Sequence, residues 1–258
     1  MSPISSIQLT PLSSSDQGKI TQLYRYLELF TEGDPPRNSL FVFAPATGPL
    51  SIGSSAPSDD ELLIIDPPAD INQRFKLGTQ VAALFTSTPE TSSIPLLQTV
   101  PGGVAHVRIG DHFLDIYSQQ HSAVVHLPAL GIFCGGGYGS DSIVPRIAAG
   151  SDGSDELETL RLLARLIKQH RVSLYIPRTG NQLTDKMSVM EKLAGDVAYI
   201  HGLRRVVTPL AQRGESMEAV SDLAESVLPR DRRTPAGWAA HRANLSSLAR
   251  AVVDQTGE

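Results

Sequence analysis

Four glycines within five positions give the stretch GIFCGGGYGSD, residues 131–141, a pattern that suggests phosphate binding. Such loops cradle phosphates when a G-x-G-x-x-G motif links a strand to a helix, because the glycines let the backbone approach the ligand. Here Ser140 stands at the last position of that motif, and Pro145 follows before a helix can form. No Gly-Lys-Ser/Thr sequence of a P-loop occurs. We interpret the run as a loop at the end of an apolar strand and keep nucleotide binding as an alternative.

The other reactive side chains are few. Cys134 is the only cysteine and ends an apolar strand, so we expect a buried, inert thiol and no intrachain disulfide. His126 alternates with apolar residues and His241 lies in a Trp238-x-x-His241-x-x-Asn244 motif. Both histidines are interpreted as packing or capping residues.

Short β-branched segments that alternate with turn residues predict the elements that position these groups. We predict strands at 40–43, 61–66, 81–87, 104–109, 112–118, 123–127, 131–134 and 172–177. Apolar residues at helical spacing predict helices at 19–30, 156–170, 184–208, 216–226 and 236–254. Strands followed by helices indicate an α+β fold. We expect an N-terminal extension with one helix, residues 1–39, and one domain, residues 40–258, whose helical tail starts at about residue 184.

The composition excludes several classes of function. The net charge of −5 and the scarcity of clustered Lys and Arg argue against binding to nucleic acid or to a membrane surface. The one basic cluster, residues 230–233, is interpreted as solvated. Neither a signal-peptide pattern nor an apolar run long enough to span a membrane is present, so we expect a cytoplasmic protein.

Seven sequence segments with strand, turn or helix patterns follow one another in an order that can be compared with known families. They are ELLIIDPP (61–68), AALFTSTPETSS (82–93), HSAVVHLPALGIFCGG (121–136), VPRIAAGSDGSDELETLRLLARL (144–166) and SLYIPRTGN (173–181), followed by YIHGLRRVV (199–207) and WAAHRAN (238–244). Together they resemble the metallo-β-lactamase-fold hydrolases, and the last segments resemble the tail of a glyoxalase-like branch. The resemblance covers about residues 40–250 and implies an αββα sandwich with a helical C-terminal extension.

In that family, two metal ions held by His and Asp activate a water. The resemblance places His121 at a retained ligand position, Gly136 at the bridging aspartate and Thr179 at the histidine of Pro-Gly-His-Gly. The first-motif ligand positions hold Ser87, Pro89, Thr91 and Ser92. One retained ligand is too few, because catalytic zinc usually takes three from the protein. We therefore expect no bound metal, and interpret the glycine run as a place where side chains are no longer required.

The resemblance implies a candidate pocket at the former metal site, lined by Asp66, Ser87, Thr91, Ser92, His121, Gly136 and Thr179. Asp66 is expected to be structural and to hold loop amides. The leading hypothesis is a non-catalytic binding or assembly module, a pseudoenzyme whose partner is an unidentified small molecule or protein. A homo-oligomer formed through the tail helices is left open.

The rival hypothesis is an ester, thioester or lactam hydrolase with an atypical site around His121. Such a site would hold a single Zn or Fe, with help from Asp111, His112 or Glu90 at the same rim, or would use a serine hydroxyl without metal. No Gly-x-Ser-x-Gly nucleophile elbow supports the serine version.

Overall fold

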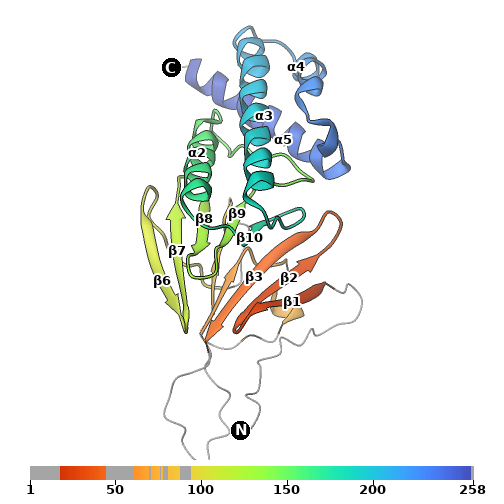
Figure 1. The fold of residues 1–258 in the computed structure, drawn as a ribbon. Helices are drawn as coiled ribbons and strands as arrows, with labels where there is room; N and C mark the ends of the chain where they lie inside the picture. The colour runs from red at the N-terminus through yellow and green to blue at the C-terminus, as the bar shows by residue number, and fades with distance from the viewer. Residues whose placement is uncertain are drawn as a thin grey trace, which may run out of the picture.

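The computed structural model describes residues 18–44, 61–69, 71–75, 77, 81–87 and 94–256. Two five-stranded sheets and a set of helices make up these residues (Figure 1). The first sheet, in spatial order, holds β1 (Lys19–Tyr24), β2 (Leu27–Glu32), β3 (Arg37–Ala44), β4 (Glu61–Ile65) and β5 (Val81–Leu84). The second has the order β10-β9-β8-β7-β6, with β6 (Val104–Ile109), β7 (His112–Ser118), β8 (Ala123–Leu127), β9 (Ile132–Gly136) and β10 (Leu174–Pro177).

The helices lie in the second half of the chain, apart from the single turn of α1 (Ile71–Arg74), and the first of them precedes β10. They are α2 (Ser154–Gln169), α3 (Lys186–Gln212), α4 (Met217–Ala224) and α5 (Pro235–Thr256), with 3₁₀ turns η1 (Glu225–Val227) and η2 (Arg230–Arg232) between α4 and α5. Figure 1 shows α4 and α5 gathered around the half of α3 that lies away from the first sheet. The predicted α+β sandwich with a helical C-terminal part is confirmed.

Three apolar layers hold the sandwich together. The inner faces of the two sheets meet in a core that includes Leu40, Leu63, Ile116 and Val125. The outer face of the first sheet is closed by α1 and Phe75, whose ring lies edge-on to Phe30 with centroids 5.1 Å apart, in a separate aromatic cluster. This outer layer is thin, so most of the helical mass lies against the second sheet.

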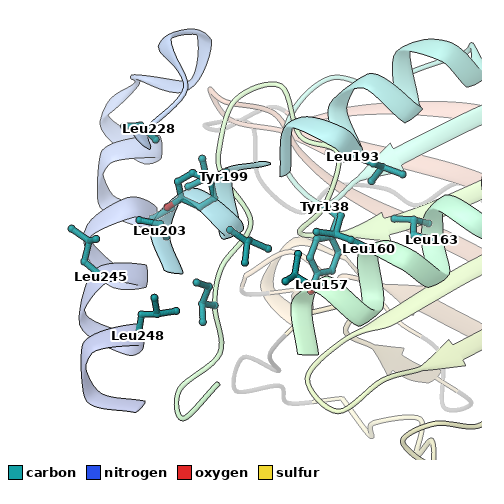
Figure 2. Packing of buried hydrophobic residues seen from close by; sticks show 14 of the residues in the cluster. Tyr138, Leu157, Leu160, Leu163, Leu193, Tyr199, Leu203, Leu228, Leu245 and Leu248 are labelled. Atoms are coloured by element: carbon teal, nitrogen blue, oxygen red, sulfur yellow. The ribbon is translucent and has the colours of Figure 1, made fainter. Parts of the chain in front are cut away.

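The third layer joins the outer face of the second sheet to α2, α3 and α5. Leu157 and Leu160 of α2 lie close to the ring of Tyr138, and Leu245 and Leu248 of α5 belong to the same apolar cluster as Tyr199 and Leu203 of α3 (Figure 2). Polar groups fix the second of these contacts, because Asn244 donates to the Tyr199 hydroxyl (3.1 Å) and to the backbone oxygen of Pro145 (2.7 Å). His241 is buried beside Tyr199, with Nδ1 3.0 Å from its hydroxyl, as expected for a packing residue.

The predicted helix at residues 19–30 is wrong. This segment forms the hairpin β1–β2, which turns at Arg25 and Tyr26, where Tyr26 has φ of 60°. Leu29 of β2 faces the core between the sheets, whereas Phe30 faces the outer aromatic cluster. A strand with apolar residues on both faces loses its two-residue alternation, so its pattern imitates helical spacing. β3 spans the boundary that we predicted between residues 39 and 40.

A buried ion pair connects the helical tail to the glycine loop. Asp196 of α3 is fully buried, and its carboxylate accepts hydrogen bonds from the Arg232 guanidinium and from the backbone N–H of Gly139 (2.6 Å). The basic cluster at 230–233 is therefore not wholly solvated as predicted, because Arg232 is buried in this pair. Burial raises the pKa of Asp196 to about 6, although Arg232 opposes that shift.

We expect Asp196→Asn to lower the free energy of unfolding by about 3–5 kcal/mol, because it leaves the Arg232 charge buried without its counterion. The matched control is Asp231→Asn, which removes a carboxylate that is 58% exposed and pairs with Lys192 at 3.4 Å. The control should change stability by no more than about 0.5 kcal/mol. Urea denaturation measures both; equal losses would show that the buried pair does not anchor the tail.

Candidate functional site

The carboxyl ends of four strands meet at one edge of the sandwich. β4 runs parallel to β5 in one sheet, and β9 runs parallel to β10 in the other. Parallel neighbours end at the same edge, so the residues that follow them are brought together. These residues are Asp66 after β4, Thr86 and Ser87 after β5, Gly136 at the end of β9, and Arg178 after β10.

Asp66 organises the loop after β5. Its backbone has φ of 53°, its side chain is buried, and its Oδ1 accepts from the Thr86 N–H at 2.9 Å. The Thr86 hydroxyl donates to Oδ2, and the Ser39 hydroxyl donates to the Asp66 carbonyl oxygen at 2.7 Å. Asp66 thus holds a loop amide, the contact that the expected structural role requires, and the role itself stays a prediction.

Arg178 brings a cation to the same place. Its Nη1 donates to Ser87 Oγ at 2.6 Å, and its Nε lies 4.0 Å from Asp66 Oδ1. The guanidinium carbon lies 5.9 Å from the centroid of the Phe85 ring, and the side chain is only 13% exposed. The backbone N–H of Arg178 donates to the Gly136 carbonyl at 2.7 Å, which ties β10 to β9. The guanidinium thus lies among positions that the family resemblance assigns to metal ligands.

Sequence reasoning missed Arg178. Thr179 stands where the resemblance places a histidine ligand, and the type of that one residue says nothing of its neighbour. The available signal was an arginine directly after the apolar strand LYIP, in a chain that retains an aspartate at the end of β4. Buried or half-buried guanidinium groups are usually paired with a carboxylate.

Gly136 is required by its neighbours. It has φ of 62°, and a Cβ added there would lie 2.7 Å from the Thr86 carbonyl oxygen and 2.9 Å from its Oγ1. The Thr86 carbonyl is itself fixed, because it accepts from the Ala123 N–H at 3.0 Å. Thr86 therefore fills the space beside the position that the resemblance assigns to the bridging aspartate. The structure adds to our expectation that side chains are not required in this loop, because at Gly136 the backbone excludes them.

The rest of the glycine run surrounds a tyrosine. A Cβ at Gly135 would lie 1.8 Å from the hydroxyl oxygen of Tyr175, and one at Gly139 would lie 2.8 Å from its ring. Tyr175 is fully buried and donates to the carbonyl oxygen of Tyr138 at 2.8 Å. These close approaches account for two glycines without a phosphate. Burial also raises the pKa of the Cys134 thiol, in agreement with the expected inert cysteine.

His121 lies in the turn between β7 and β8 and pairs with α2. Its Nε2 is 3.4 Å from Oδ2 of Asp155 in the first turn of α2, and its side chain is 35% exposed. The neighbouring Ser122 hydroxyl lies 3.0 Å from the Thr159 hydroxyl, which joins the same turn to the same helix. In the described part of the chain, the contact found for His121 is thus with a carboxylate on a helix.

The remaining predicted residues separate into three groups. Thr179 follows Arg178 and forms an isolated antiparallel bridge with Arg37. Thr91 and Ser92 lie outside the described residues, as does Glu90. Asp111 and His112 do not share the rim with His121: the turn at Gly110 approaches Ala44, which pairs with the start of β4, whereas Asp66 follows its end. His112 Nε2 instead lies 2.7 Å from the Arg25 carbonyl oxygen.

The described residues do not fit a dinuclear metal site. No group of three or more His, Cys, Asp or Glu side chains among residues 18–44, 61–69, 71–75, 77, 81–87 and 94–256 is arranged to hold a metal ion. More directly, Asp66 is engaged by Thr86, and the Arg178 guanidinium lies 4.0 Å from it. The positive charge beside the Asp66 carboxylate is thus a guanidinium, which cannot bind a water molecule as a metal ion does.

Comparison with solved structures identifies the fold. The chain matches a beta-lactamase domain protein from Burkholderia ambifaria with a TM-score of 0.57 and 10% identity, over 93% of this chain and 90% of that one. It matches a metallo-beta-lactamase family protein from Thermus thermophilus with a TM-score of 0.55 and 12% identity, over 92% and 95%. The chain therefore has the metallo-β-lactamase fold.

A third match is the stereoselective inverting sec-alkylsulfatase from a Pseudomonas species, with a TM-score of 0.56 and 11% identity. It covers 92% of this chain, which spans 50% of the length of the sulfatase chain. No family model matches the sequence, and no curated protein matches it. None of the helices in the described ranges is long and apolar enough to cross a bilayer.

We expect Gly136→Ala to lower the free energy of unfolding by about 1–3 kcal/mol, because alanine disfavours the positive φ and its Cβ meets the Thr86 carbonyl. Gly137→Ala is the matched control in the same loop, where an added Cβ has nothing within 4 Å. The control should stay within about 0.5 kcal/mol of the parent. Chemical denaturation compares them, and an unchanged Gly136→Ala variant would contradict the close contact with Thr86.

Arg178→Met should lower the free energy of unfolding by about 1–3 kcal/mol, because Ser87 loses its donor and the Asp66 carboxylate loses a nearby positive charge. Arg161→Met provides the comparison, since Arg161 is 59% exposed and pairs with Glu158 on the surface of α2. Its loss should be at most about 0.5 kcal/mol. Similar values for the two variants, measured by urea denaturation, would mean that Arg178 does not hold the strand ends together.

Proposed function

We propose that this chain is a metallo-β-lactamase-fold protein in which a dinuclear metal site has been replaced by a metal-free polar site around Asp66 and Arg178. In this proposal the protein acts as a binding or assembly module, a pseudoenzyme of the hydrolase superfamily. The observation that carries the proposal is the Arg178 guanidinium, which donates to Ser87 Oγ at 2.6 Å and lies beside Asp66.

The chemistry of the cation supports a loss of hydrolysis. A metal ion lowers the pKa of a bound water and so supplies a nucleophile near neutral pH. A guanidinium carries a similar positive charge but has no coordination position and stays protonated, so it cannot generate hydroxide. It does balance the charge of Asp66, which lets the strand ends stay together.

The packing at Gly136 supports the same proposal. Restoring an aspartate there would place its Cβ 2.7 Å from the Thr86 carbonyl, so the loop after β5 would have to move first. In this chain, the backbone at position 136 therefore disfavours the bridging carboxylate as well as lacking it. This arrangement favours a site adapted to another use over a site that one substitution would revive.

The converging strand ends suggest a small-molecule or protein partner, because loops at this edge are where such folds carry their sites. Assembly through the tail is the other form of the proposal. Met217 and Leu223 of α4 are 45% and 58% exposed, which leaves apolar area at the far end of the helical layer.

Metal content and turnover test the proposal together. Untagged protein, purified without chelator and incubated with zinc, iron or manganese before desalting, should retain far less than one metal equivalent by inductively coupled plasma mass spectrometry. It should also lack metal-dependent turnover of ester, thioester, lactam and sulfate-ester substrates. One or two retained equivalents, together with a turnover that chelator abolishes, would overturn the proposal.

The second candidate function is a hydrolase with an atypical mononuclear or metal-free site around His121. The observation that favours it is the His121–Asp155 pair, because a carboxylate that orients an imidazole is a common part of general-base sites. Any hydrolysis that is found should fall in His121→Ala and persist in His201→Ala, which changes an exposed histidine of α3. Activity unchanged in His121→Ala would remove this candidate.

A further inference from the structure

A row of side chains crosses the outer face of the second sheet, away from the candidate site. His106 of β6 pairs with Asp115 of β7, Asp115 pairs with His126 of β8, and His126 pairs with Phe133 of β9. Residues directly opposite in adjacent strands project on the same face, so these four side chains are neighbours. The row runs from the exposed edge at β6 to the region covered by α2.

His126 is the buried member of this row. Its side chain is 1% exposed, and neither ring nitrogen has a hydrogen-bond partner in the described part of the chain. The imidazole stacks on the Phe133 ring with centroids 4.1 Å apart. The centroid of the tilted His170 ring lies 4.7 Å from that of His126. A buried polar side chain without partners is uncommon and calls for a physical reason.

The groups around His126 do not offer an imidazolium a good partner. Asp115 Oδ2 lies 4.0 Å from His126 Nδ1, but Oδ1 of the same carboxylate is 2.7 Å from Nδ1 of His106. His170, at the C-terminal end of α2, adds a second titratable ring. The backbone oxygens of Lys168 and His170 at that helix end accept from Lys186 Nζ of α3, at 2.6 and 3.4 Å. The carbonyls that would stabilise a cation therefore already bind one.

His170 begins the connection that leads to the candidate site. Its N–H closes the last turn of α2 on Leu166 at 3.0 Å, and Ser173 then donates to the Gly131 carbonyl at 2.8 Å. β10 follows directly, from Leu174 to Pro177, and Arg178 comes next. A conformational change at His170 would therefore occur only a few residues before β10, the strand that Arg178 follows.

We propose that His126 is a proton-sensitive latch between the β7–β9 strands and the C-terminal end of α2. As a neutral ring it stacks on Phe133, contacts the tilted ring of His170 and holds the α2–β10 connection against the sheet. When it takes up a proton, the charge lies among an aromatic ring, a second imidazole and a shared carboxylate, and the connection opens to admit water. The latch does not depend on whether the candidate site binds a metal, a ligand or a partner.

The direction of the pH dependence follows from the two states of His126. Burial, with a further contribution from His170, lowers the pKa of His126 to about 4, and Asp115 opposes this only partly. In an open or unfolded state the group titrates near its ordinary value of about 6.5. The closed state is therefore fully favoured above about pH 6.5 and loses this advantage as the pH falls towards 4.

Hydrogen exchange at the amides of His170, Ser173 and Leu174 tests the latch in the full chain. After correction for intrinsic rates, their opening equilibrium should rise by up to about tenfold per pH unit as the pH falls below 6.5, and by about 160-fold in all by pH 4. His126→Phe should remove this dependence, because phenylalanine keeps the stack and cannot be protonated. His201→Gln, at an exposed histidine of α3, should keep the parental dependence.

Two results would overturn the proposal. One is exchange at these amides that does not depend on pH in the parent, or that has the same dependence in His126→Phe. The other is an NMR titration of the His126 imidazole in the parent protein with a midpoint near 6.5. The titration needs no variant, so it decides the question even if His126→Phe does not fold.

Discussion

The contact on which the candidate site depends is the one between the Asp66 carboxylate and the loop that follows β5. Asp66 leaves β4 with a left-handed backbone, and its Oδ1 binds the Thr86 N–H at 2.9 Å. This bond sets the position of Thr86, whose carbonyl binds Ala123 and leaves room only for glycine at position 136. Ser87, one residue further, then accepts from Arg178. The carboxylate thus ties β4 to the loop after β5, and that loop in turn contacts the ends of β9 and β10.

A positive charge beside Asp66 stabilises the fold whether or not the protein is a catalyst. A buried carboxylate is costly unless hydrogen bonds or a positive charge balance it. The resemblance implies that metal ions do this in related hydrolases, and here a guanidinium lies within 4.0 Å of Asp66. In the proposed function, the guanidinium keeps the electrostatic balance of the fold and supplies no activated water. The fold is shared with the solved metallo-β-lactamase-fold proteins although the identity is only 10–12%.

Most of the fold was predictable, because apolar strands and amphipathic helices leave local patterns. β1 and β2 were not, since both faces of β2 are covered and the alternation that marks a strand disappears. Arg232 was misread as solvated because its partner, Asp196, lies 36 residues away in the sequence. The place of Asp66 at a strand end was predictable, because it follows the apolar run ELLII. Arg178 and Thr86 were missed, because their roles depend on parallel strands from two different sheets ending together.

The central claim is that Arg178 takes the place of metal ions beside Asp66, and a crystal structure of the full chain grown with excess zinc tests it most directly. Diffraction data collected on both sides of the zinc absorption edge locate the metal independently of the surrounding residues. The account predicts no anomalous peak within ligand distance of Asp66, with the Arg178 guanidinium still bound to Ser87. Zinc bound by Asp66, with Arg178 displaced and His121 turned towards the metal, would contradict it.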